Sequence, residues 1–153
     1  MSQSQKYRGS CFCGEIEFTL VGQPELMGYC HCNSCRHWSA GPVNAFTLWK
    51  PDSFKITKGS ENLAGFDKIA ATSNQPGTSL RKWCTSCGSH VVIEHPTMGL
   101  VDVPAAIIEG FSFTPAFHVH YQETVQPMKD GLQKFRDLPT EAGGSGEVMI
   151  EQD

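Results

Sequence analysis

The chain has 153 residues, of which 39% are hydrophobic and 18% charged, and its formal net charge is −4 at pH 7. This is the size of one ordinary domain, large enough to bury a core without disulfide staples. The acidic balance argues against a surface that neutralises phosphates, and no apolar run approaches the ~20 residues that cross a membrane. We therefore expect neither a nucleic-acid partner nor a membrane partner. The opening MSQSQKYRGS lacks the apolar segment of a signal peptide, which predicts a cytoplasmic protein.

Strand patterns dominate the chain. Residues 15–22 alternate Ile16, Phe18 and Leu20 with polar neighbours, which predicts a half-buried strand. Further strands are predicted over 43–49, 53–59, 80–84, 89–95, 100–110 and 116–124, with 80–84 and 89–95 as the arms of a hairpin. Residues 33–40 predict one or two helical turns capped by Asn33 or Ser34, and 60–79 should be loop with at most one short strand. The result is one β-rich domain over 7–139, between a disordered segment 1–6 and a flexible acidic tail 140–153.

Seven cysteines stand in three tight groups: Cys11 and Cys13; Cys30, Cys32 and Cys35; Cys84 and Cys87. An odd number cannot pair fully into disulfides, and such clustering in an intracellular chain indicates metal binding.

The sequence CTSCGS places Cys84 and Cys87 three residues apart before a glycine, the pattern of a zinc knuckle that supplies two ligands. Cys11 and Cys13, in CFCG, are candidates for the other two ligands of a closed structural site. Alternatively, Cys11 and Cys13 are ordinary buried cysteines, because residues i and i+2 of any strand share a face.

Cys30, Cys32 and Cys35 then remain for a second metal. Three protein ligands with an exchangeable fourth is the arrangement of a catalytic zinc. In the alternative, His31 or His37 closes the site; His37 is better placed, because His31 lies between two ligands on an expected strand and should point away. A redox role for Cys32 and Cys35 is a further alternative, although the βαβ context of such motifs is missing.

Together the elements GSCFCGEIEF, CHCNSCRHWSAG and LRKWCTSCGS resemble the glutathione-dependent formaldehyde-activating enzyme family, which includes centromere protein V. Arg36 and Arg81 stand at the family's positions, and HVHYQETVQPMKDGLQKFRDLP is similar to its last strand, which carries a histidine and is followed by an aspartate and an aromatic residue. The resemblance implies a mainly β, single zinc-stabilised domain of packed antiparallel sheets, similar to zinc-binding methionine sulfoxide reductases. It also implies two zinc ions per chain: a structural zinc on Cys11, Cys13, Cys84 and Cys87, and a functional zinc on Cys30, Cys32 and Cys35.

The activity implied is that of a carbon–sulfur lyase acting on adducts of a small, glutathione-like thiol and a formaldehyde-like aldehyde. Such chemistry suits a zinc with an open position, which can bind a thiol or polarise a carbonyl. The alternative is a non-catalytic zinc scaffold that binds a protein partner. Nothing in the sequence sets the oligomeric state.

Two side chains are substrate candidates. Arg36 can bind a carboxylate such as those of glutathione, or pair locally instead. His118 shares a strand face with His120, opposite Phe117, Val119 and Tyr121 on the core side. A polar edge toward solvent is the expectation for His120, while His118 is kept as a pocket candidate. Trp38, Trp49 and Trp83 are expected in the core or around the metal sites. Met128 stands where the family commonly has tryptophan, a change that either alters the pocket or repacks it.

Overall fold

The computed structural model describes residues 5–150 of the chain. These residues form two compact units, each assembled from two separate stretches of sequence. The first unit holds the residues up to Leu26 together with Thr47–Ser112. The second holds Met27–Phe46 together with the residues from Phe113 onward. Within residues 5–150, no helix has the length and apolar character that a membrane crossing requires.

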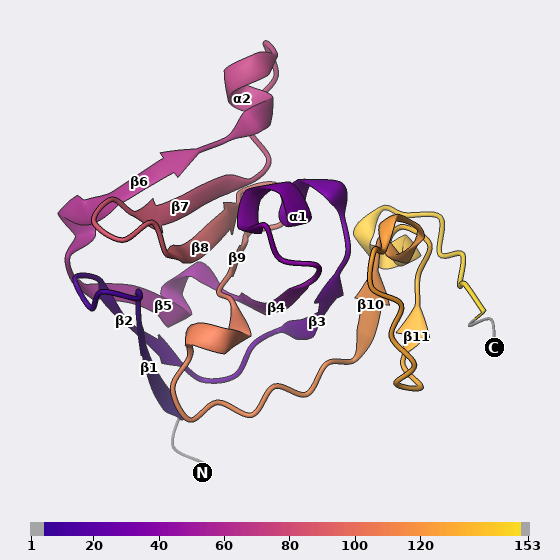
Figure 1. Ribbon diagram of the computed structural model, residues 1–153, viewed down its shortest axis with the longest axis horizontal. Coiled ribbons are helices and arrows are strands. Elements are labelled where there is room, and N and C mark those ends of the chain that lie inside the picture. The colour runs from indigo at the N-terminus through magenta and orange to yellow at the C-terminus, as the bar shows by residue number, and fades with distance from the viewer. Residues whose placement is uncertain (1–4, 151–153) are drawn as a thin grey trace. The chain divides into compact units, whose positions relative to one another are not determined.

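The first unit contains a three-stranded antiparallel sheet with the strand order β1-β2-β5 (Figure 1). Its strands are β1 (Lys6–Ser10), β2 (Glu17–Val21) and β5 (Phe54–Lys58), and a 3₁₀ turn at Pro51–Ser53 precedes β5. The alternation predicted for β2 is confirmed, because Phe18 and Leu20 are buried while Glu17 is exposed. Because side chains alternate with a two-residue period, one face of the sheet is buried in the core.

A second antiparallel arrangement in the first unit has the strand order β4-β9-β8-β7-β6. The strands are β4 (Asn44–Trp49, of which Thr47–Trp49 belong to this unit), β6 (Leu63–Phe66), β7 (Leu80–Cys84), β8 (His90–His95) and β9 (Leu100–Asp102). The predicted hairpin is confirmed, since β7 and β8 pair side by side (Figure 1). Trp49 is fully buried, as expected, and its Nε1 donates a hydrogen bond to Thr47 Oγ1 at 2.8 Å.

Two segments of the first unit differ from the prediction. Residues 60–79 contain a 3₁₀ turn (Ser60–Asn62) and the expected short strand, β6, but also a helix, α2 (Lys68–Thr72). The side chain of Asp67 caps α2 by accepting from the Ala70 N–H at 3.2 Å, and five residues are too few to leave a periodic signal. The strand expected over 100–110 ends at Asp102, because Pro104 leads into a 3₁₀ turn at Ala105–Ile107.

The second unit has the strand order β11-β10-β3-β4. It contains β3 (Leu26–Cys30, of which Met27–Cys30 belong to this unit), β10 (Phe117–Val119) and β11 (Gln133–Lys134), together with the first half of β4. Both β3 and β11 run parallel to β10, which lies between them. The expectation of antiparallel sheets is therefore wrong for this part of the mainly β fold, because β3 and β10 come from distant stretches of chain rather than from a hairpin.

Short helical elements complete the second unit. Helix α1 (Asn33–Ser39) confirms the predicted turns, but its N-cap is Cys32 rather than Asn33 or Ser34. A 3₁₀ turn at Tyr121–Glu123 follows β10 and replaces the predicted end of that strand. Another 3₁₀ turn spans Thr140–Ala142.

Residues 140–150, expected as part of a flexible tail, pair with the chain around β11. Phe135 forms an antiparallel bridge with Val148, and the Met149 N–H donates to the Lys134 carbonyl at 2.7 Å. The Asp137 carboxylate accepts hydrogen bonds from the N–H groups of Leu138 and Ser145. The remaining residues of the predicted tail, 151–153, and most of the predicted disordered segment, residues 1–4, lie outside the described residues.

Candidate functional site

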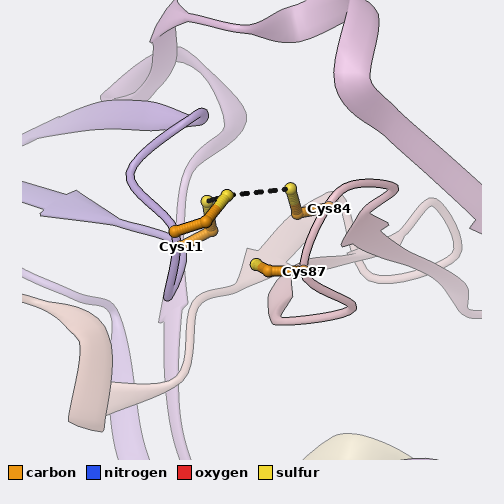
Figure 2. Close-up of side chains that lie close together, drawn as sticks. Cys11, Cys84 and Cys87 are labelled. Carbon is orange, nitrogen blue, oxygen red and sulfur yellow. Dashed lines mark hydrogen bonds between the residues drawn. The ribbon is translucent and has the colours of Figure 1, made fainter.

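Four cysteines of the first unit converge from two distant stretches of sequence. Cys11 and Cys13 follow β1, while Cys84 ends β7 and Cys87 lies in the turn after it; their four sulfurs lie within 4.8 Å of one another. Figure 2 shows the side chains of Cys11, Cys84 and Cys87 pointing toward a common centre. In each pair a glycine with positive φ, Gly14 or Gly88, closes the turn, a conformation that costs glycine little. The tight turns therefore aim both sulfurs of each pair inward.

The distances in this cluster suit a tetrahedral zinc ion. Cys13 Sγ lies 3.6 Å from Cys11 Sγ and 3.8 Å from Cys84 Sγ. A tetrahedral zinc with bonds of about 2.3 Å separates its sulfur ligands by about 3.8 Å. All seven cysteines are free thiols. The Ile16 N–H also donates to Cys11 Sγ at 3.3 Å, the kind of contact that stabilises a thiolate.

The second cluster lies in the second unit, where β3 passes into α1. Cys30 ends the strand, Cys32 caps the helix, and Cys35 stands in its first turn, with all three sulfurs within 4.8 Å of one another. Cys35 Sγ lies 3.8 Å from Cys30 Sγ, and the Cys35 N–H donates to Cys32 Sγ at 3.2 Å. The end of β3 and the start of α1 thus bring the three thiols together.

These three thiols cannot all ionise side by side without a cation. Hydrogen bonds from Cys30 and Cys35 lower the pKa of Cys32 to about 2, while the hydrogen bond to Cys32 raises the pKa of Cys30 well above its usual range. Hydrogen bonding within the cluster thus favours the thiolate on Cys32 and the thiol on Cys30. A bound metal ion is what allows further thiolates at such a point, so the donor set fits a soft divalent metal such as zinc.

No histidine or carboxylate among residues 5–150 completes the second cluster within the same distance. His37, the better-placed candidate, uses Nδ1 to donate to the Asn33 carbonyl at 2.9 Å. The side chain of His31 instead contacts His118. The closed site of three thiolates and one imidazole is therefore absent from this arrangement.

His31 and His118 form a buried pair in the second unit. Both side chains are 0% exposed, and His31 Nε2 lies 2.8 Å from His118 Nδ1. Their rings stack with centroids 5.0 Å apart, and Tyr121 packs edge-on against both. His118, the pocket candidate, thus does not lie on a polar edge toward solvent: β10 has a neighbouring strand on each side, and Tyr29 also stacks on the His118 ring.

The histidine pair is hydrogen-bonded to a carboxylate, which also binds a lysine. His118 Nε2 lies 2.7 Å from Asp130 Oδ2, and Lys134 Nζ donates to Asp130 Oδ1 at 3.0 Å. Lys134 is 1% exposed, whereas the Asp130 side chain is 28% exposed. Partial burial opposes ionisation of Asp130, but the hydrogen bonds from His118, Leu132 and Lys134 prevail and lower its pKa to about 2. Burial, aided by His118, lowers the pKa of His31 to about 4.

Sequence reasoning missed Asp130 and Lys134 as parts of this cluster. A buried lysine leaves no pattern in a sequence, and the two-residue strand β11 that carries it is too short to predict. The family resemblance includes an aspartate after the last strand, Asp130, but gives it no role. The spacing Asp130–Lys134 adds little, because it is common on protein surfaces.

The remaining candidates make local contacts. Arg36 Nε donates to the His31 carbonyl at 3.2 Å, and its Nη2 donates to Asn33 Oδ1 at 3.3 Å. Local pairing is thus one of the two roles considered for Arg36. The Met128 N–H donates to Tyr121 Oη at 2.8 Å, which places the backbone of this residue against a ring that packs on the histidine pair. His120 Nδ1 lies 3.4 Å from Glu123 and takes no part in the pair.

A family model described as glutathione-dependent formaldehyde-activating enzyme matches residues 6–123. The matched span includes all seven cysteines, His31 and His118, whereas Asp130 and Lys134 lie beyond it.

Two curated relatives are similar to this chain. A protein of Schizosaccharomyces pombe named as an uncharacterized lyase is 29% identical over 84 residues, which are 55% of this chain and 54% of the relative. The chain thus matches about half the length of that relative. A protein of Halomonas elongata that carries the formaldehyde-activating family name is 27% identical over 114 residues, covering 73% of this chain and 71% of the relative.

Among solved structures, the crystal structure of a Rhodobacter sphaeroides protein from a structural genomics project is similar in fold, with a TM-score of 0.50 and 22% sequence identity. The match covers 69% of this chain and 90% of that one.

Proposed function

The chain belongs to the glutathione-dependent formaldehyde-activating enzyme family, and on that premise we propose that it forms or cleaves the carbon–sulfur bond of a thiol–aldehyde adduct. The thiol is small and glutathione-like, and the aldehyde is formaldehyde-like. The observation that carries the proposal is the cluster of Cys30, Cys32 and Cys35, three converging thiols that no other side chain among residues 5–150 completes.

The chemistry follows from the number of ligands. A zinc ion held by three thiolates keeps a fourth position for an exchangeable ligand, and there it lowers the pKa of a thiol or polarises a carbonyl. The protein fixes the three sulfurs through the end of β3 and the cap and first turn of α1. In the addition, sulfur forms a bond to the carbonyl carbon, the carbonyl π electrons pass to oxygen, and the proton lost by the thiol ends on that oxygen. Cleavage is the reverse.

The cluster of Cys11, Cys13, Cys84 and Cys87 has a different role in this proposal. With four thiolates it leaves no open position, so it would hold a structural zinc that ties the turn after β1 to the turn after β7. The protein is thus a zinc-stabilised domain with two zinc ions per chain, with a fold related to zinc-binding methionine sulfoxide reductases. Its free thiols suit the reducing cytoplasm.

The test combines metal content with spectroscopy and activity. Zinc per chain is measured in the parent and in Cys32→Ser, and zinc-edge absorption spectra are recorded before and after glutathione is added. Two zinc ions in the parent, loss of one in the variant, and a new sulfur ligand on adding glutathione support the proposal. NMR then measures the exchange between glutathione, formaldehyde and their adduct. A faster exchange in the presence of the protein supports the proposed activity.

The non-catalytic scaffold predicts other results. In that case the second metal would not change its ligands with any thiol, and the exchange rate of the adduct would equal that in buffer. Ser34→Ala is a matched control for Cys32→Ser, because Ser34 is exposed and lies in the same segment without being a candidate ligand.

A further inference from the structure

A cleft in the first unit takes no part in the chemistry proposed above. Its volume is about 440 Å³, which lies within the roughly 300–1,000 Å³ of small-molecule sites. It is bordered by the turn that carries Cys11 (Figure 2) and by the 3₁₀ turn at Ala105–Ile107 with the residues that follow. The lining residues that bear on binding are Ser10, Phe12, Ser89, Ile107, Ile108 and Glu109. All of them belong to the first unit, so the cleft lies within one compact body.

The backbone beside β1 determines which side chains face the cleft. Gly9 forms an antiparallel bridge with Ile108, and the Glu109 N–H donates to the Arg8 carbonyl at 2.8 Å. A Cβ at Gly9 would collide with the Phe18 ring, so this side of β1 faces the core. Because side chains alternate along a strand, the residues on either side of Gly9 point away from the core, and the residue after it lines the cleft.

Glu109 brings a negative charge to the cleft. Its side chain is exposed and forms no ion pair with any other residue in the range 5–150. Arg8 lies opposite Glu109 across the bridge, but the two side chains do not pair, and Arg8 does not line the cleft. An exposed pair of this kind is worth little when it does form, so Arg8 is a weak competitor for the carboxylate. The cleft therefore favours a cation.

Two hydroxyl groups add acceptors beside this carboxylate. Ser89 Oγ donates to the His90 carbonyl at 3.4 Å, which leaves its lone pairs available. Ser10 Oγ has no hydrogen-bond partner in the part of the chain that the structure describes. The cleft thus offers three acceptor groups, and a primary ammonium group has three N–H donors. A quaternary ammonium group has none and could not use them.

The rest of the cleft is apolar. Phe12 is 91% exposed, so its ring face is open to a ligand, while Ile108 is 6% exposed and Ile107 is half-buried. A cation over a phenyl ring is attracted by the negative ring face, and an alkyl chain gains from contact with the isoleucines. The cleft therefore suits a molecule with one charged end and an apolar stem.

We propose that this cleft is a binding site for a small primary alkylamine, with the ammonium group held by Glu109, Ser10 and Ser89 and the alkyl stem packed against Phe12, Ile107 and Ile108. The proposal does not rest on the carbon–sulfur chemistry above, because the three thiols of that site belong to the second unit.

The test titrates the full chain, with its metal bound, with hexylamine in phosphate buffer, since amine buffers would compete. Two-dimensional ¹⁵N NMR of the backbone amides locates the binding and gives the dissociation constant. We expect saturable shifts at Ser10, Ser89 and Glu109. Hexanol keeps the stem without the charge, and hexyltrimethylammonium keeps the charge without the N–H donors. Each should bind at least about 5-fold more weakly, because it lacks the charge-assisted hydrogen bonds.

Variants assign the binding to individual side chains. Glu109→Gln should weaken the binding of hexylamine at least about 5-fold, whereas Glu61→Gln, at an exposed position of the same unit outside the cleft, should not change it. Phe12→Ala should weaken binding about 2- to 5-fold, the value of a cation–π contact at an exposed site. Arg8→Gln should tighten it by removing the nearest competing cation. Glu109 and Phe12 are exposed, so zinc content and urea unfolding of these variants should match the parent.

Several results would overturn the proposal. Hexanol binding as tightly as hexylamine would mean that the cleft is only an apolar surface. Equal binding of hexyltrimethylammonium would exclude recognition of N–H donors. Equal losses in Glu109→Gln and Glu61→Gln would reduce the effect to attraction by an acidic protein, and no saturable shift at the cleft would exclude the site. Because these results need no measurement of adduct exchange, the proposed function can fail or stand independently of them.

Discussion

Lys134 Nζ donates to Asp130 Oδ1 at 3.0 Å while the lysine is 1% exposed and the carboxylate side chain 28% exposed. The two charged groups therefore differ in how well each is solvated when the other is removed. Without Lys134 the carboxylate still has water and the Leu132 N–H, whereas without Asp130 the ammonium group stays buried with the Leu132 carbonyl at 3.1 Å.

We predict that Asp130→Asn destabilises the protein more than Lys134→Met does. A buried charge stripped of its partner costs about 3–5 kcal/mol, whereas Lys134→Met removes the buried charge itself and should cost roughly 1 kcal/mol. Urea unfolding of the two variants measures the difference. Equal losses, or a larger loss for Lys134→Met, would show that the buried ammonium does not need the carboxylate.

The lowered pKa of Asp130 predicts a pH dependence of stability. Its folded pKa is about 2 against about 3.9 in the unfolded chain, so the ionised form favours the fold above pH 4, and this contribution is lost as the pH falls from about 4 to 2. The difference in unfolding free energy between the parent and Asp130→Asn should be constant from pH 7 to 5 and shrink below pH 4. A difference that already shrinks between pH 7 and 5 would mean that another group governs it.

Cys84→Ser should remove the metal from the four-cysteine cluster and weaken the first unit. Cys84 is fully buried, and serine offers no thiolate. We expect one zinc fewer per chain and a loss of about 3 kcal/mol or more in unfolding free energy, since a metal-binding free energy of roughly 10–16 kcal/mol is coupled to folding at such sites. Zinc analysis and urea unfolding check both. Thr85→Ser, at an exposed neighbour in the same turn, should change neither quantity.

Gly28→Ala tests the parallel pairing of β3 with β10. A Cβ at Gly28 would lie 2.6 Å from the Phe117 carbonyl oxygen and 2.8 Å from the Phe46 ring, so the strands must separate. We expect a loss of about 1–3 kcal/mol, the usual cost of overpacking, seen in thermal unfolding. Gly41→Ala should cost little, because the nearest atom to its Cβ is a serine hydroxyl at 3.4 Å. Similar losses at both glycines would contradict close pairing at Gly28.

Much of the fold could be predicted because its signals are local. The alternation in β2 and the hairpin of β7 and β8 depend on neighbours in sequence, and both predictions are confirmed. The grouping of the cysteines also follows from spacing, since tight turns fix each pair or triplet. That these clusters bind zinc remains a prediction.

What could not be predicted depends on contacts between distant residues. The sequence HVHY reads as a strand with one polar face, and only the insertion of β10 between β3 and β11 shows why His118 is buried. The role of Cys32 as the helix cap was missed for a different, local reason: a sulfur acts here as the acceptor that serine or asparagine usually supplies.

The discontinuous make-up of the second unit affects how the protein is made. The ribosome delivers Cys35 some 80 residues before Phe117, a delay of roughly 4 to 16 s at the usual 5–20 residues per second. Throughout that interval β3 lacks its parallel neighbour, β10. The three thiols then lie on a nascent segment in which His31 has no His118 to contact. Each new molecule thus passes through a period in which these three thiols are open to oxidants, and early metal capture would protect them.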